Sequence, residues 1–236
     1  MRGIRAVLFD LDGTLRYNDP PGREFFIDYA ASLGLPVDDE TRRRTYLWEH
    51  AYWAESPELL ADQLAYTDHK SFYEHYSARQ LVVLGCSPSQ AAELSPRFSA
   101  YMDAHYKPAD RLFDDTHETL STLKARGYIL GVVSNRDKPF GEYLEQKGLS
   151  RLVDFNLSGA EAGVKKPNPG ILHKAAQMAG VESAQSVYIG DNYHADIIAA
   201  RAAGMRPILY DRHGIFDNAD CEVITELKQL LILLPQ

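Results

Sequence analysis

Two aspartates one residue apart are the first residues of this chain whose types and spacing suggest chemistry. Asp10 and Asp12 follow an apolar run from Ile4 to Phe9 and precede Gly13. An apolar run of this length predicts a buried strand, and alternate residues of a strand point to the same side. Two carboxylates held close together repel each other, so the pair suggests a bound cation or a shared proton-transfer task. A simple turn at Asp12 and Gly13 is the alternative interpretation.

Other polar residues follow later apolar runs that also predict strands. Ser134 ends the second run, Asp191 follows the fourth, and Lys165 and Lys166 precede a predicted helix. Because strand ends in an open α/β sheet share one edge, we expect three carboxylates, a hydroxyl and an ammonium to gather there. Carboxylates without histidine or cysteine suit Mg²⁺. Hydroxyl, ammonium and backbone N–H groups suit phosphate oxygens.

The elements that must position these residues are of two kinds. From about residue 107 onward, predicted strands alternate with helices, which is typical of a Rossmann-like, doubly wound parallel sheet in an α/β fold. The segment 17–106 predicts helices only. We therefore expect a catalytic core of residues 1–16 and 107–236 with an inserted all-helical domain of residues 17–106. Within this scheme we expect a turn-rich break at 16–22 and a capping box at Asp115 to Glu118.

The composition narrows the possible partners. The chain has 236 residues and a formal net charge of -8, which argues against nucleic acid or an anionic membrane as a partner. No apolar run approaches the roughly 18 residues of a membrane span. The two cysteines, Cys86 and Cys221, lie far apart, and a strand begins almost at once, so we expect a cytoplasmic protein without a signal peptide. A monomer or a homodimer is compatible with this sequence.

The motifs, taken together, resemble those of a known family. In order and spacing they resemble the four motifs of the haloacid dehalogenase (HAD) superfamily, and the helical insertion resembles that family's C1-type cap. The resemblance covers the whole chain. It rests on these stretches: Asp10-Leu-Asp12-Gly-Thr14, Ser134-Asn135, Lys166-Pro167, and Gly190-Asp191 with Asp196 five residues later.

The resemblance implies a role for each acidic residue. Asp10 resembles the nucleophile that forms an aspartyl-phosphate. Asp12 resembles the general acid and base that protonates the leaving oxygen and then activates water. Asp10, the backbone carbonyl of Asp12, and Asp191 would hold Mg²⁺. Asp196 would support the metal site or orient a water.

The remaining motif residues resemble the family's phosphate-binding and supporting groups. Ser134 and Asn135 would bind the phosphoryl group, and Lys166, rather than Lys165, would neutralise the charge that it shares with Asp10. Thr14 and Asn192 would support the site.

The implied activity is Mg²⁺-dependent hydrolysis of a small-metabolite phosphomonoester. A phosphosugar mutase similar to β-phosphoglucomutase would keep the same Asp-x-Asp pair. A 2-haloacid dehalogenase needs no second carboxylate, so Asp12 argues against it. A phosphonatase would need a cap lysine, for which Lys70 is the sole candidate. A binding protein without catalysis is disfavoured because all the acidic positions are present.

Two further groups of residues are candidates for a role in the site. Arg16 and Arg136 would meet an anionic substrate, but loop arginines are more often solvated, which is what we expect of them. We expect a pocket under the cap to be lined by some of four aromatic residues of the helical segment: Trp48, Tyr52, Trp53 and Tyr66.

Overall fold

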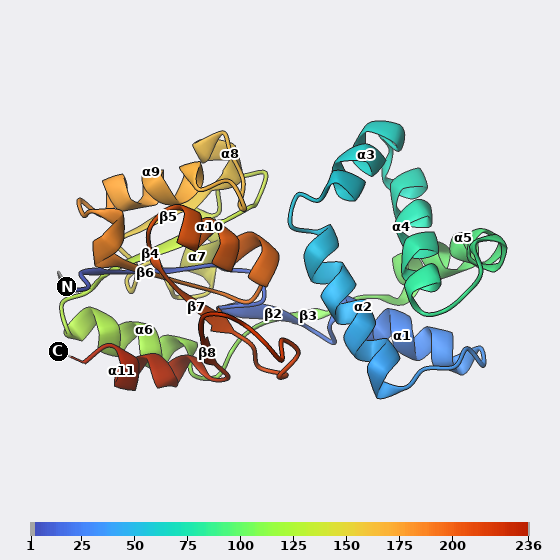
Figure 1. Cartoon of the computed structure of the whole chain (residues 1–236), viewed down its shortest axis with the longest axis horizontal. Coiled ribbons are helices and arrows are strands. Elements are labelled where there is room, and N and C mark those ends of the chain that lie inside the picture. Colours follow the sequence, from blue (N-terminus) through green and yellow to red (C-terminus); the bar gives the residue numbers. More distant parts are fainter. Residues whose placement is uncertain (1–2, 236) are drawn as a thin grey trace. The chain divides into compact units, whose positions relative to one another are not determined.

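The computed structural model describes residues 3–235. The chain forms two compact units, which are linked by two crossings of the backbone. The first, here called the core unit, contains the chain up to Tyr17 and from Arg111 onward. The second, the helical unit, is Asn18–Asp110. Each unit has its own apolar core, so each is described separately (Figure 1).

A six-stranded parallel sheet forms the centre of the core unit. The strand order is β5-β4-β1-β6-β7-β8, with every neighbouring pair parallel. The α/β, Rossmann-like doubly wound class predicted from the sequence is therefore confirmed. The strands are β1 (Ala6–Phe9), β4 (Ile129–Ser134), β5 (Phe155–Ser158), β6 (Ser186–Gly190), β7 (Arg206–Tyr210) and β8 (Glu222–Ile224).

The register of the central strands places the motif residues at one edge. Phe9, the last residue of β1, is paired with Val132 of β4 and with Ile189 of β6. Asp10 therefore leaves the sheet between the ends of its two neighbours, where Ser134 and Gly190 end β4 and β6. The order reverses at β1, and such a switch point opens a crevice beyond the strand ends.

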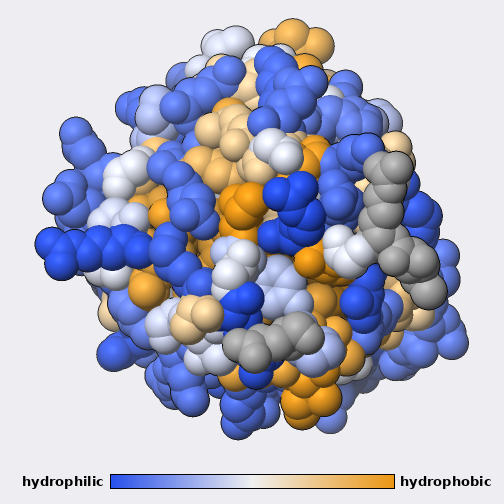
Figure 2. Space-filling model, turned by 90° about the vertical axis from the view of Figure 1, so that its left-hand side faces the viewer, coloured by the Kyte–Doolittle hydropathy of each residue, from blue (hydrophilic) through white to orange (hydrophobic). Residues whose placement is uncertain are grey.

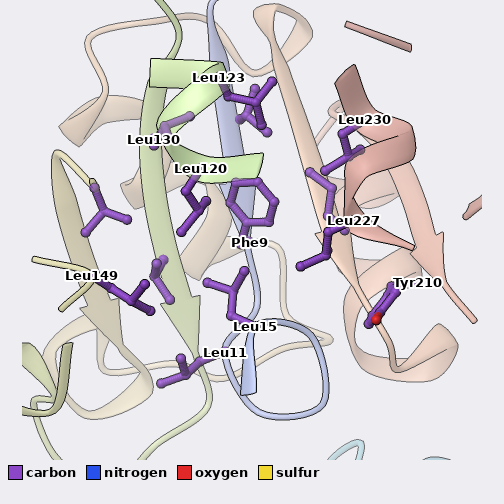
Figure 3. Close-up of a cluster of buried hydrophobic side chains, with 14 of the residues drawn as sticks. Phe9, Leu11, Leu15, Leu120, Leu123, Leu130, Leu149, Tyr210, Leu227 and Leu230 are labelled. Atoms are coloured by element: carbon purple, nitrogen blue, oxygen red, sulfur yellow. The ribbon is translucent and has the colours of Figure 1, made fainter. Parts of the chain in front are cut away.

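The alternation of side chains along β1 supplies both faces of the sheet with apolar groups. Val7 and Phe9 join a cluster with residues of α6 (Thr116–Ala125) and α11 (Leu230–Leu233), which Figure 3 shows around Phe9. Ala6 and Leu8 join a second cluster on the opposite face. Helices α9 (Gly170–Met178) and α10 (Ile198–Ala202) cover that face. Because β1 is fully buried on both faces, its sequence is continuously apolar.

The remaining helical segments of the core unit are short. They are α7 (Gly141–Gln146), α8 (Gly159–Ala162), a π-helical turn (Tyr193–Ile197) and two 3₁₀ turns (Ser183–Gln185 and Leu227–Gln229). The π turn is directly continuous with α10 and follows the end of β6.

The helical unit contains five helices, as the sequence predicts for this segment. They are α1 (Gly22–Ser32), α2 (Asp39–Tyr52), α3 (Pro57–Ala65), α4 (His69–Val83) and α5 (Pro88–His105). Polar caps define their starts: the side chains of Asp38, Ser56, Asp68 and Ser87 each accept a backbone N–H from the first turn. These bonds satisfy donors that a helix start otherwise leaves unpaired.

Two local expectations are wrong. The stretch at 16–22 is not simply a break, because β2 (Arg16–Asp19) pairs with β3 (Ala109–Leu112) in a two-stranded sheet. Four-residue strands carry too short a pattern to stand out beside Pro and Gly. Helix α6 begins where expected, but Asp115 does not cap it. Its carboxylate accepts the backbone N–H of Lys228 instead, a contact between distant parts of the chain.

Among the described residues, no helix has both the length and the apolar character that crossing a bilayer requires. One face of the molecule is shown in Figure 2, where hydrophilic side chains predominate and hydrophobic ones lie between them.

Candidate active site

A buried lysine is the centre of the site. The Lys166 ammonium donates to Asp10 Oδ1 at 2.5 Å and to Asp196 Oδ1 at 2.6 Å. Lys166 is only 2% exposed, and Asp196 1%. Burial by itself lowers the pKa of Lys166, but Asp10 and Asp196 outweigh it and hold that pKa well above its usual value. The side chain is therefore a permanent positive charge beside Asp10.

Three carboxylates converge beyond the ends of β1 and β6. Oxygen atoms of Asp10, Asp191 and Asp196 all lie within 4.8 Å of one another. Burial is the main reason that the pKa of Asp10 rises to about 7, and Lys166 opposes that rise. Burial also raises the pKa of Asp191 well above its usual value, and its neighbours Asp10 and Asp196 add to the effect. Such crowding of like charges is typical of a site that binds a cation.

Two glycines make this convergence sterically possible. Gly13 has a φ of +93°, and a Cβ there would lie 2.2 Å from Asp191 Oδ2. A Cβ on Gly190 would lie 2.2 Å from Asp196 Cγ. Any larger residue would therefore push one of these two carboxylates out of the group. Glycine is required here for close approach, and at Gly13 also for its backbone conformation.

Thr14 and Asn192 hold acidic residues in place, as supporting residues would. The buried hydroxyl of Thr14 donates to Asp191 Oδ1 at 3.2 Å. The backbone N–H of Asn192 donates to Asp196 Oδ2 at 2.9 Å. The Asn192 side chain caps the π turn by accepting the backbone N–H groups of His194 and Ala195. π turns within helices often occur at functional sites, and this one directs Asp196 back toward Lys166.

Asn135 has a different position from the one expected. Its side-chain amide donates to the Lys166 carbonyl at 2.8 Å, and its side-chain oxygen accepts the Lys166 N–H at 2.7 Å. Both ends of the amide are thus engaged by the backbone of Lys166, so the side chain positions the lysine, and its predicted role in binding phosphate stays a prediction. Ser134, which is buried, has its hydroxyl 3.4 Å from Asp12 Oδ2.

Asp12 is separate from the three-carboxylate group. Its carboxylate is held by a two-pronged ion pair with Arg136, in which Nε and Nη2 lie 2.9 and 2.8 Å from its two oxygens. Arg16 Nη1 also donates to Asp12 Oδ1 at 3.2 Å. The expectation that both arginines are merely solvated is therefore wrong. The metal ligand predicted at Asp12 is its backbone carbonyl, and that assignment stays a prediction.

Sequence reasoning missed Tyr188. This residue lies in the middle of β6, and its hydroxyl donates to the Val133 carbonyl at 2.9 Å and accepts from Lys166 at 2.8 Å. Burial is the first reason that its pKa lies well above the usual value. The available signal was a hydroxyl between two apolar residues, Val187 and Ile189, in the middle of a buried strand. The preference for Lys166 over Lys165 agrees with the structure, because Lys165 instead pairs with Asp137 at 2.8 Å.

The aromatic residues of the helical unit pack mainly against one another. Tyr52 is buried in a cluster with Trp48 and Tyr76, and its hydroxyl donates to Asp62. The Trp53 indole donates to the Tyr76 hydroxyl. Tyr52 is 1% exposed and has little surface left to line a pocket, and the expectation that some of the four aromatic residues do so stays a prediction.

The chain is similar to proteins of one enzyme family along most of its length. A family model described as haloacid dehalogenase-like hydrolase matches residues 4–204. The phosphoglycolate phosphatase of Aliivibrio fischeri is 30% identical over 241 residues, which cover 98% of this chain and 96% of that protein. Haloacid dehalogenase-like hydrolase domain-containing protein 3 of Bos taurus is 38% identical over 210 residues, covering 87% and 81%.

Solved structures show the same fold. A 2-haloacid dehalogenase from Pseudomonas syringae is 27% identical with a TM-score of 0.55, and 98% of each chain is covered. A HAD phosphatase from Thermococcus onnurineus is 24% identical with a TM-score of 0.58 and the same coverage. At 24% identity, the similarity to the Thermococcus onnurineus structure shows only that the two chains share a fold.

Proposed function

The chain belongs to the haloacid dehalogenase-like hydrolases and is an enzyme of the phosphatase type, and we propose that it hydrolyses the phosphomonoester of a small metabolite. The observation that carries this proposal is the buried Lys166 ammonium, which bridges Asp10 and Asp196 at the switch point of the sheet. A nucleophilic carboxylate beside a fixed cation suits attack on an anionic phosphorus centre.

We propose Mg²⁺ as the cofactor, held by Asp10 and Asp191 with Asp196 in support. The donors are carboxylate oxygens, which suit this hard cation. One ammonium does not balance three carboxylates. Burial is the main cause of the raised pKa values of Asp10 and Asp191, and the neighbouring carboxylates add to it. A bound dication would supply positive charge to the phosphoryl oxygens and favour the ionised form of Asp10.

The proposed first step is phosphoryl transfer to Asp10. A carboxylate oxygen of Asp10 attacks phosphorus, the bond to the leaving oxygen breaks, and protonated Asp12 gives its proton to that oxygen. The second step reverses the role of Asp12: as a carboxylate, it takes a proton from water as that water attacks phosphorus. The Asp10–phosphorus bond then breaks and inorganic phosphate leaves. Lys166 balances the negative charge next to Asp10 through both steps.

The helical unit is the proposed cap, with a role in excluding water and selecting the substrate. Its two apolar clusters give it a structure of its own, and its connections to the core unit run through β2 and β3. The cytoplasmic location stays a prediction.

Phosphate release tests this function directly. We expect Mg²⁺-dependent hydrolysis of p-nitrophenyl phosphate that EDTA abolishes and that Asp10→Asn lacks. A panel of small phosphomonoesters, 2-phosphoglycolate among them because of the relatives, then ranks the substrates. Beryllium fluoride, a phosphoryl mimic, should bind the wild type and not Asp10→Asn. Retention of full activity in Asp10→Asn would refute the proposal, and consumption of a sugar phosphate without release of phosphate would favour the mutase.

A further inference from the structure

Within residues 3–235, four acceptors lie within hydrogen-bond distance of the Lys166 ammonium, which has three protons to donate. Asp10 Oδ1, Asp196 Oδ1 and the Tyr188 hydroxyl lie 2.5, 2.6 and 2.8 Å from its nitrogen. The Val133 carbonyl lies farther away, at 3.3 Å. The three short contacts therefore account for all three N–H groups. Two of them go to carboxylates of the motifs, and the third goes to an uncharged tyrosine outside the motifs.

The direction of the Tyr188 hydroxyl is fixed by its second partner. The hydroxyl lies 2.9 Å from the Val133 carbonyl, which can only accept a hydrogen bond, so the hydroxyl donates its proton there. Its oxygen is then available to accept from Lys166. By donating to the Val133 carbonyl, the hydroxyl also competes with the lysine for that acceptor. Tyr188 thus offers one N–H of Lys166 a short bond and occupies the alternative acceptor.

The ring of Tyr188 is held by the packing of the sheet. It is 0% exposed and lies in the apolar cluster that contains Leu8 of β1 together with Ala199 and Ala200 of α10. The Lys166 nitrogen lies 5.3 Å from the centre of the ring. A phenylalanine would fill the same space, whereas a buried hydroxyl costs free energy unless it is hydrogen-bonded. Packing therefore accounts for the ring, and the two hydrogen bonds account for the hydroxyl.

We propose that Tyr188 is a positioning residue, whose hydroxyl fixes the Lys166 ammonium beside Asp10 for phosphoryl transfer. This inference rests on the proposed function and extends it to a residue outside the motifs. Because Tyr188 is 0% exposed, it acts through the lysine and not by contact with the substrate. Without the hydroxyl, the third N–H of Lys166 turns to the Val133 carbonyl, and three short bonds no longer hold the nitrogen. A charge that is fixed before the reaction stabilises the transition state without a cost of reorganisation.

Tyr188→Phe tests the assignment, because it removes the hydroxyl and keeps the ring. With p-nitrophenyl phosphate and saturating Mg²⁺, we expect kcat to fall about 10-fold, the lower end of the range for a hydrogen bond to a charged group. KM should change less than kcat, because the ammonium acts mainly on charge that develops in the transition state. A loss of stability alone would lower the Tm and leave kcat unchanged at temperatures well below it. A melting curve for each variant therefore sets the assay temperature.

A matched control separates the bond to the lysine from the general loss of a tyrosine hydroxyl. Tyr128→Phe removes another hydroxyl of the core unit that donates to a backbone carbonyl, that of Pro235 at 2.7 Å. That contact does not involve Lys166. The control variant should keep the wild-type kcat and KM.

NMR of the lysine ammonium groups gives a measurement that does not depend on activity. Buried, hydrogen-bonded N–H protons exchange slowly with water, so Lys166 should give a ¹H–¹⁵N ammonium signal that Lys166→Met lacks. In metal-free Tyr188→Phe this signal should shift or broaden. In Tyr128→Phe it should keep its wild-type position.

Each other outcome contradicts the assignment in a different way. A wild-type kcat in Tyr188→Phe, or an equal loss of kcat in both phenylalanine variants, overturns the inference and leaves the phosphatase standing. An unchanged Lys166 signal in Tyr188→Phe, or no such signal in the wild type, shows that the hydroxyl does not hold the ammonium and overturns the inference as well. No Mg²⁺-dependent hydrolysis of any phosphomonoester by the wild type would overturn the proposed function together with the inference.

Discussion

The Lys166 nitrogen lies 2.5 Å from Asp10 Oδ1, although 155 residues separate the two in the chain. Both residues are buried, and Asp196, from the π turn that follows β6, contacts the same nitrogen. A buried ion pair contributes little net stability when complete, but removal of one partner strands the other charge. Substitution of either residue should therefore change both the stability of the core unit and its catalytic activity.

The first prediction concerns Lys166→Met. Loss of the ammonium removes the charge that faces the phosphoryl group, so we expect kcat to fall by about 100- to 1,000-fold. The stranded carboxylates should also lower the free energy of unfolding by ~3–5 kcal/mol near pH 8, measured in urea. Lys165→Met is the matched control, since Lys165 pairs with Asp137 instead. Full activity in Lys166→Met would contradict the assigned role.

The second prediction concerns pH and metal. The pKa of Asp10 is about 7 in the folded protein, and burial raises it from the value of 3.8 that applies to an ordinary aspartate. Between pH 4 and 7 the folded protein thus binds the proton more tightly than the unfolded chain, so Asp10 makes the metal-free protein less stable as pH rises through this window. Mg²⁺ requires the ionised carboxylate, so it should raise the Tm more at pH 8 than at pH 5.5.

Thermal melts with and without Mg²⁺ at the two pH values measure this difference. Asp10→Asn cannot titrate at this position, so the part of the pH dependence that comes from Asp10 should disappear. Equal Mg²⁺-induced shifts in the wild type at both pH values would argue against a cation beside Asp10.

The third prediction separates the two steps assigned to Asp12. Asp12→Asn cannot protonate a leaving oxygen, so kcat/KM should fall by about 100- to 10,000-fold for an alkyl phosphate. The loss should be much smaller for p-nitrophenyl phosphate, whose leaving group needs no proton. kcat/KM reports the steps from substrate binding through phosphoryl transfer, whereas kcat also includes hydrolysis of the intermediate. Equal losses in kcat/KM for both substrates would contradict the role of Asp12 as the acid.

The fourth prediction concerns the helical unit. Asp62 is buried and accepts two hydrogen bonds from Arg79, at 2.6 and 2.9 Å, and one from Tyr52 at 3.0 Å. Asp62→Ala leaves these donors without their acceptor, which should destabilise the unit by about 3 kcal/mol. Well below the lowered melting temperature, Mg²⁺-dependent hydrolysis of p-nitrophenyl phosphate should still be measurable. Asp28→Ala is a suitable control, because that carboxylate is largely exposed and bonds to Arg42.

Much of the core unit follows from local patterns in the chain. Short apolar runs that end in polar residues identify the strands, and their alternation with helices identifies a parallel sheet. The residues that follow those strands, among them Asp10, Ser134 and Asp191, had to lie at one edge because parallel strands all end on the same side. The family resemblance adds roles to them but was not needed to bring them together.

Only the tertiary structure decided which of these side chains contact each other. The order of residues in the chain does not predict that the Asn135 side chain bonds to the backbone of Lys166. Nor does it predict that the Tyr188 hydroxyl accepts a hydrogen bond from that lysine. Each contact joins residues from different strands and loops. The contact of Arg136 is likewise not predicted by the sequence, because a loop arginine is expected to be solvated. Its partner Asp12 is 124 residues away. Local propensity follows from the neighbours along the chain, whereas the pairing of charges depends on distances in space, which the packing of the sheet and its helices alone determines.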